Sequence, residues 1–321
     1  MAELIYAASI ARTLENTLLG QEKITRMVFA ASYEEGVRVL EESGFGNAGE
    51  GGVDGMIAAE EARLARFMKE VGGLKGMQSF ALVNDYHNAK AFMKAKYGKT
   101  GDPSFMLAPD GTIESARLED AVMNDSYESL PEKMADALSG IDAYFASNPR
   151  SGRYIDLMLD KAMYSHVLEV SRKAGSVEKY WKVEIDHANA ETLLRMKGAG
   201  APEKDFREQL IDGGEISPDT LAALYEEEEG VILEKLKYTC VAAAAGEYAA
   251  DKSFARFEAC KDNRQLEIFK NDRYDVFSVA PIAGYYVAKK LELKAVKMIT
   301  TLLKINADKS LIKERLREFY V

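Results

Sequence analysis

The chain has 321 residues, of which 47% are apolar and 29% are charged, and it contains only 7 prolines. This composition predicts a folded protein with a sizeable core and excludes long disordered regions. The formal net charge of −10 argues against nucleic acid and anionic lipid as main partners, because both reward a basic surface. We therefore expect a soluble protein that binds other proteins.

Neither a secretory signal nor a membrane-spanning helix is predicted. The first 19 residues lack a basic leader and a long apolar core. The longest uncharged stretch of note, Phe277–Ala288, contains Pro281 and Gly284 and is shorter than the roughly 20 residues that a membrane span needs. We expect no direct membrane insertion, so any membrane association should run through another protein.

The first clear loop of the chain is the glycine-rich segment Gly44–Gly55. It lacks the Gly-Lys-Ser/Thr ending of a P-loop, and no predicted strand precedes it as a dinucleotide fingerprint requires. We predict a surface loop rather than a phosphate site, and no cofactor is expected.

A 19-residue segment occurs twice without a gap, at 81–99 and at 182–200. Both copies carry Asp-x-x-Asn-Ala, with Asp85 and Asn88 in the first and Asp186 and Asn189 in the second. Repeats of this kind decide the architecture of a chain. We therefore take these four residues as a structural repeat signature.

Both copies have the periodicity of a helix. Leu82, Tyr86, Ala89 and Met93 fall at i, i+4, i+7 and i+11, which places them on one face of a helix, and the second copy has the same pattern. Strand signals are nearly absent, so the chain is predicted to be all-α.

The two aspartates are interpreted as lying near the start of each helix. There a carboxylate accepts hydrogen bonds from free backbone N–H groups and meets the positive end of the helix dipole. Lys96 and Lys197 lie near the predicted helix ends, where a cation is favourable.

The similarity continues beyond each helix. The turn LAPDGTI at 107–113 resembles LIDGGEI at 210–216, and Pro218 is predicted to begin the next helix of the second copy. A third, weaker copy lies at 281–303, where Glu292 aligns with Asp85 but the asparagine is replaced by Ala295.

We predict three helical units, at 1–148, 149–248 and 249–321, with the loop 147–152 as the first junction. Units of this kind bury their cores against one another.

Histidines beside two of the acids raise the hypothesis of a metal site or a general-base pair. His87 follows Asp85 by two residues, and His187 follows Asp186 directly. Neither histidine is reproduced at the equivalent position of the other copy, whereas the aspartate and the asparagine are. The repeat therefore favours a structural role, and no catalytic or metal-binding residue is expected.

The two cysteines, Cys240 and Cys260, belong to no Cys-x-x-Cys pattern. We expect them to be buried, reduced thiols, which fits a cytosolic compartment.

Charge is unevenly distributed along the chain. Residues 225–230 form an acidic run, whereas 285–317 contains nine lysines and arginines against three acids. A basic helix in an acidic protein makes the surface dipolar and can orient docking. A plain solvated face is the alternative for both segments.

Three blocks together resemble the C subunit of prokaryotic V-type (A-type) ATPases, the counterpart of the d subunit of eukaryotic V-ATPases. They are NDYHNAKAFMKAK at 84–96, EIDHANAETLLRMKG at 184–198 and the terminal segment 288–321. In the terminal segment Glu292, residues 314–317 and Tyr320 fit the family pattern, whereas Lys290 replaces an acid and Ala295 an asparagine.

The resemblance implies a non-enzymatic rotor part built from three pseudo-symmetric helical domains that form a funnel or socket. Its expected partners are the central-stalk subunits and the proteolipid ring of the membrane rotor, at the cytoplasmic face of the membrane. It would transmit torque between ATP turnover and proton or sodium transport. Two alternatives stay open, a helical-repeat scaffold of another assembly and a metal-dependent hydrolase that uses Asp85, His87, Asp186 or His187.

Overall fold

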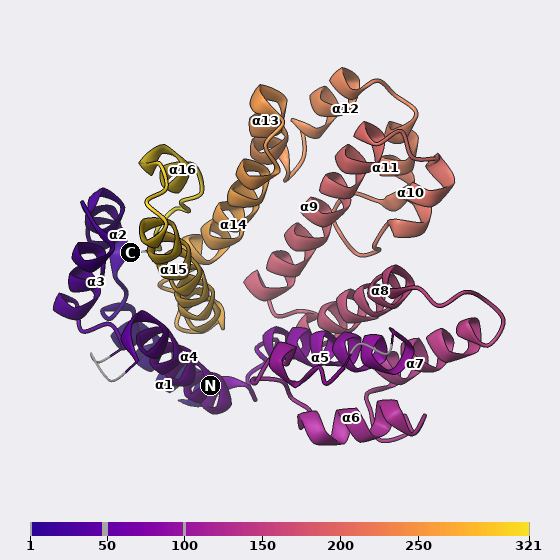
Figure 1. Cartoon of the computed structure of the whole chain (residues 1–321), viewed down its shortest axis with the longest axis horizontal. Coiled ribbons are helices and arrows are strands. Elements are labelled where there is room, and N and C mark those ends of the chain that lie inside the picture. The colour runs from indigo at the N-terminus through magenta and orange to yellow at the C-terminus, as the bar shows by residue number, and fades with distance from the viewer. Residues whose placement is uncertain (1, 47–50, 99–100, 321) are drawn as a thin grey trace.

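The computed structural model describes residues 2–46, 51–98 and 101–320, and within these ranges the chain forms helices and no β-strand (Figure 1). The predicted all-α fold is thus confirmed. In chain order the helices are α1 (Ala2–Glu15), α2 (Gly20–Phe29), α3 (Tyr33–Glu42), α4 (Gly52–Val71), α5 (Gln78–Gly98), α6 (Ser115–Met123), α7 (Glu132–Phe145), α8 (Gly152–Ser171), α9 (Ser176–Gly198), α10 (Glu203–Gln209), α11 (Pro218–Tyr225), α12 (Glu229–Leu236), α13 (Ala242–Asp251), α14 (Phe254–Asn271), α15 (Ala280–Lys304) and α16 (Lys309–Glu314). A 3₁₀ turn, Ser104–Met106, lies between α5 and α6.

The two copies of the repeat lie within α5 and α9, and their apolar faces are buried as predicted. Tyr86 and Ala89 of α5 are fully buried, as is Ala190 of α9. The helix-start interpretation of the two acids is wrong, however. Asp85 lies seven residues into α5 and Asp186 ten residues into α9, because both helices begin earlier, after turns that contain Gly76 and Gly175 at positive φ.

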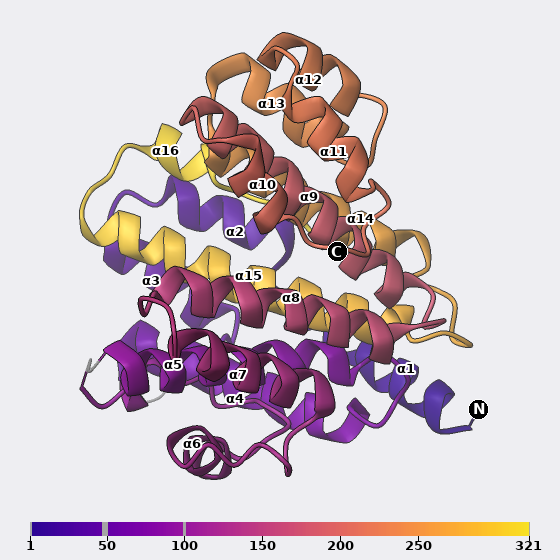
Figure 2. The same ribbon diagram turned by 90° about the vertical axis from the view of Figure 1, so that its right-hand side faces the viewer.

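Long helices are arranged as consecutive pairs that recur along the chain. The pairs are α4–α5, α8–α9 and α14–α15, each joined by a short turn (Figure 2). The helices α4, α8 and α14 begin at positions 52, 152 and 254, so the period is about 100 residues. The pair of long helices therefore recurs three times between residues 52 and 304, and α15 contains the third copy of the repeat.

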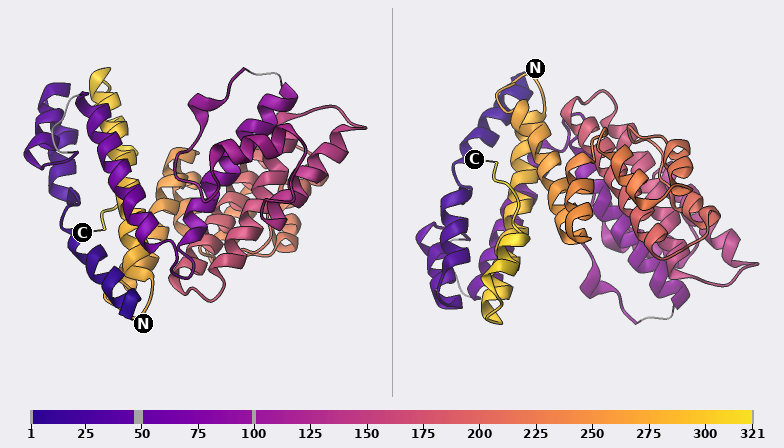
Figure 3. Two further views of the ribbon diagram at one scale, coloured as in Figure 1. Left: turned by 90° about the horizontal axis from the view of Figure 1, so that it is seen from below. Right: turned by 90° about the horizontal axis from the view of Figure 1, so that it is seen from above.

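The long helices also pack in a recurring order. α5 packs along α8, and α9 packs along α14. α15 has no later helix of this kind and packs instead against α1, α3 and α4, so the two ends of the chain come together in one part of the molecule (Figure 3). The unit boundaries at 148 and 248 stay a prediction.

Two apolar clusters form the core. The larger one includes residues of α1–α5, α8 and α15, and the smaller one joins the second half of α9 to α10–α14. Because α15 contributes many buried residues to the larger cluster, the C-terminal part of the sequence is needed to complete the core of the N-terminal part.

Several local predictions can be compared with the structure. Ser217 caps α11 by accepting from Thr220 N, so the helix start at Pro218 is confirmed. The predicted loop 44–55 is partly wrong, because α4 begins at Gly52, where Val53 and Met56 enter the core; residues 47–50 of that loop lie outside the described residues. None of the described helices is long and apolar enough to cross a membrane.

Candidate functional site

The first copy of the signature binds the turn that follows α5. Asp85 Oδ2 accepts hydrogen bonds from Thr112 N (3.0 Å) and Thr112 Oγ1 (2.6 Å), and its Oδ1 accepts from Ile113 N (2.9 Å). The Asn88 amide donates to Ala108 O (3.0 Å) and accepts from Ala108 N (2.8 Å). The middle of α5 therefore fixes the segment that leads into α6.

The second copy makes the same contacts. Asp186 accepts from Glu215 N and Ile216 N, both at 2.9 Å. Asn189 donates to Ile211 O (2.7 Å) and accepts from Ile211 N (2.9 Å). The Asp-x-x-Asn signature thus recognises the backbone of the returning turn in both copies, which explains why the two motifs and the two turns occur together.

A glycine in each turn makes room for the aspartate. A Cβ atom on Gly111 or on Gly214 would lie closer than 3.0 Å to Oδ1 of Asp85 or Asp186, a separation that real Cβ atoms do not show. The resemblance between the turns 107–113 and 210–216 therefore has a steric cause.

Glu292 binds a turn in the third copy, but that turn comes from the other end of the chain. Its carboxylate accepts from Leu19 N (2.5 Å), immediately before α2, and from Lys289 Nζ (2.6 Å). Lys289 Nζ also lies 2.7 Å from Glu60 Oε2 of α4. Burial raises the pKa of the Glu292 carboxyl, and the neighbouring Lys289 opposes this shift.

The Asp–His pairs of the hydrolase hypothesis are not formed. His87 Nε2 lies 2.8 Å from Met106 O, and His187 Nδ1 lies 2.8 Å from Val183 O of its own helix. Burial lowers the pKa of His187 to about 4, so this imidazole is neutral at physiological pH. The third histidine, His166, lies 3.2 Å from the Tyr86 hydroxyl.

One group of possible metal ligands occurs in the described part of the chain. Atoms of Asp186, Glu215 and Cys240 lie within 4.8 Å of one another. The Cys240 thiol donates to Asp186 Oδ2 (3.2 Å), and burial raises the pKa of this thiol, which keeps it protonated. Because both oxygens of Asp186 already hold the turn backbone, the group is explained by the turn contact. Cys240 and Cys260 are half-buried free thiols rather than fully buried ones.

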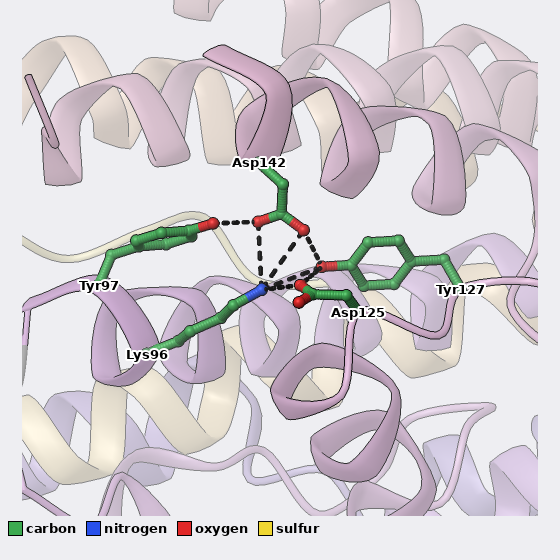
Figure 4. Close-up of polar contacts among 5 residues, drawn as sticks. All are labelled: Lys96, Tyr97, Asp125, Tyr127 and Asp142. Atoms are coloured by element: carbon green, nitrogen blue, oxygen red, sulfur yellow. Dashed lines mark hydrogen bonds and ion pairs between the residues drawn. The ribbon is translucent and has the colours of Figure 1, made fainter. Parts of the chain in front are cut away.

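The C-terminal end of α5 is held by a compact polar cluster (Figure 4). Lys96 Nζ contacts Asp125, Tyr127 Oη (3.3 Å) and Asp142 Oδ1 (3.1 Å). The Tyr97 hydroxyl donates to Asp142 Oδ1 (2.5 Å), and the Tyr127 hydroxyl donates to Oδ2. Burial, followed by the bond to Asp142, raises the pKa of both phenols. The cluster fixes α5 against α7, so Lys96 has a tertiary role in addition to its place near the helix end.

Three neighbouring pockets form a hollow along α15, and residues of α4, α5, α9 and α14 contribute to its other walls. Their volumes are about 290, 400 and 450 Å³, and all three are lined by Leu291 of α15. We call them together the central hollow. Sequence reasoning did not identify its lining, because the orientation of each helix about its axis depends on the tertiary packing.

The α15 wall of the central hollow is basic. Lys290, Lys294 and Lys297 line it at i, i+4 and i+7, and all three are exposed. Seven basic and five acidic side chains line the three pockets. The lining therefore carries a net charge of +2, although the whole chain carries −10. Glu292, the only acid of α15, is buried away from this face. Part of the predicted basic segment thus faces the hollow.

An all-α repeat around a charged hollow defines a class of proteins that bind other macromolecules through shape and surface charge. Within that class, the chain belongs to the ATP synthase (C/AC39) subunit family, whose sequence model matches residues 7–315. The resemblance found in the three sequence blocks is thereby confirmed.

Relatives in archaea show the same similarity. The chain is 25% identical to the C subunit of the A-type ATP synthase of Methanocaldococcus jannaschii, over 93% of this chain and 82% of that protein. It is 24% identical to the C subunit of the A-type ATP synthase of Methanosarcina acetivorans, over 97% of this chain and 92% of the relative. The corresponding subunit of Thermococcus gammatolerans is 31% identical over 50% of this chain and 45% of its own length.

Proposed function

We propose that this chain is a non-catalytic central-rotor adapter of an A/V-type ATPase. It joins the central stalk to the membrane rotor ring at the cytoplasmic face and passes torque between them. The family match along residues 7–315 supports this role, as do the names of the archaeal relatives. The complex as a whole would couple ATP turnover to the transport of protons or sodium ions.

The observation that carries the proposal is the central hollow, which lies between helices from distant parts of the sequence. A socket for a stalk needs walls that do not yield when the stalk turns. Buried ion pairs and buried apolar faces supply such walls here, since Lys289 joins α15 to α4 and Trp181 Nε1 donates to Ser79 Oγ (2.7 Å) between α9 and α5.

The signature contacts support the same mechanical role. The helices α5 and α9 each bind their returning turn through a buried aspartate, so a load on the turn passes directly to a helix. The Asp and His residues hold the backbone in this way rather than facing a common reaction centre, which supports a non-catalytic subunit over the hydrolase alternative.

Purification of the affinity-tagged full-length protein from detergent-solubilised membranes tests the proposal. Central-stalk and rotor-ring subunits should co-purify, and membranes from a strain that lacks this gene should hydrolyse ATP without ATP-driven ion uptake. Recovery of the protein alone, with ion uptake intact in the deletion strain, would remove the adapter role and leave the scaffold hypothesis.

A further inference from the structure

We propose that the exposed lysine stripe of α15, formed by Lys290, Lys294 and Lys297, is a docking surface for the acidic end of a helical protein. The inference rests on the proposed adapter function, because it assigns a chemistry to the partner of the central hollow. The α15 wall of the central hollow is the wall that attracts the acidic partner.

The stripe is held on a rigid support. α15 spans Ala280–Lys304, and its opposite face is buried, with Val296 and Ile299 fully inaccessible. The side chains of Lys290 and Lys297 make no ion pair within residues 2–46, 51–98 and 101–320, whereas Lys294 Nζ lies 3.1 Å from Asp262 Oδ2. Two of the three charges are therefore available to carboxylates of another protein.

The size of the hollow limits what enters it. One turn of a helix that is about 10 Å wide occupies roughly 400 Å³. The pocket that contains all three lysines has a volume of about 450 Å³, and the neighbouring pocket that contains Lys294 has a volume of about 400 Å³. These two volumes together accept about two turns of one helix end, or about one turn of a pair of helices.

The other walls define the apolar and charged features of the partner. Met68 of α4 and Met298 of α15 offer apolar surface. The acids of the hollow lie on other elements than α15: Glu61 on α4, Asp110 before α6, Glu184 on α9, and Asp262 and Glu258 on α14, of which Asp262 pairs with Lys294. Carboxylates are thus favoured on only one side of the incoming helix end, so the charges fix its rotational setting as well as its affinity.

Charge reversal of the two unpaired lysines, Lys290→Glu together with Lys297→Glu, tests the inference. The matched control is Lys204→Glu with Lys235→Glu, which makes the same charge change at exposed lysines of α10 and α12 outside the hollow. The probe is the purified central stalk of the same ATP synthase, and the dissociation constant is measured with the full-length protein at about 0.05 M and 0.3 M salt. Equal thermal unfolding of all variants establishes that they are folded.

The stripe variant should bind the stalk at least about tenfold more weakly than wild type at low salt, with a smaller salt dependence. The affinity of the variant with Lys290→Gln and Lys297→Gln should lie between the affinities of wild type and the stripe variant. The α10/α12 control should bind the stalk as tightly as wild type. Unchanged affinity and salt dependence in the stripe variant would overturn the inference while leaving the adapter function in place. Failure of the wild-type protein to bind the stalk would instead overturn the proposed function itself.

Discussion

Oδ1 of Asp186 occupies the place into which a side chain at Gly214 would grow. The same relationship holds between Asp85 and Gly111 in the first copy, so the motif on the long helix and the glycine in the turn form one steric unit. A substitution in either partner is expected to disturb the contact between helix and turn.

Gly214→Ala is therefore expected to lower the free energy of unfolding by about 1–3 kcal/mol, because the turn or the carboxylate must move. Chemical denaturation measures the effect. Gly140→Ala is the matched control, since a Cβ there meets no atom within 4 Å and α7 gains about 0.5–1 kcal/mol from the better helix former. Equal stabilities of the two variants would contradict the steric account.

Asp186→Asn should cost about 1–3 kcal/mol, because the amide group cannot accept from both Glu215 N and Ile216 N. The exposed Asp205→Asn change in the first turn of α10 should cost no more than about 1 kcal/mol. Urea unfolding of both variants distinguishes a turn contact from a simple helix-dipole effect. A loss at Asp186 no larger than that at Asp205 would favour the dipole explanation.

Lys289 and Lys290 are consecutive, yet Lys289 is 1% exposed between two carboxylates whereas Lys290 is exposed. Lys289→Met should cost about 3–5 kcal/mol, because it leaves Glu292 buried without its cation and leaves Glu60 with Arg63 alone. Lys290→Met should change stability by less than about 0.5 kcal/mol.

Neutralising the whole buried group is the control for this ion network. Lys289→Met combined with Glu60→Gln and Glu292→Gln should recover most of the loss, since no unpaired charge is then buried. If the triple variant were as unstable as Lys289→Met alone, the cost would arise from packing and not from charge.

His187 should make stability depend on pH. Its pKa is lowered from 6.5 to about 4 in the folded protein, so the unfolded chain binds a proton first as the pH falls. The His187 contribution is fully present above about pH 6.5 and is lost progressively down to about pH 4, for a total of about 3 kcal/mol. The free energy of unfolding is measured for wild type and for His187→Leu at several pH values. Relative to the variant, wild type should lose this amount of stability as the pH falls from about 6.5 to about 4. A difference that does not change with pH would contradict the role of His187.

Much of the architecture could be predicted because it repeats in the sequence. The residues of 81–99 and 182–200 carry a clear helical period, so α5 and α9 and their buried faces followed from it. The motif and the turn were both visible, but Asp85 and Thr112 are 27 residues apart, and periodicity does not reveal a contact between them. The helix start was predicted wrongly for the same reason, since a helix start offers a carboxylate free N–H groups nearby in the sequence, whereas the real partners of Asp85 and Asp186 are 27 to 30 residues away.

The third copy was less predictable, because its contact partner lies at the far end of the chain. Glu292 binds Leu19 N across 273 residues, and no local pattern indicates such a contact. The central hollow shows the same limit. The excess of lysine and arginine at 285–317 was visible in the sequence, but which of these side chains point inward depends on the packing of α4, α5, α9 and α14.

The packing of α15 against α4 has a consequence for synthesis on the ribosome. α4 ends at Val71 and α15 begins at Ala280, so about 200 residues separate them. At roughly 5–20 residues per second, the apolar face of α4 waits about 10–40 s for its partner helix to emerge. The part of the protein that is made first therefore becomes native last, and a nascent chain stalled before α15 presents that uncovered face to chaperones and proteases.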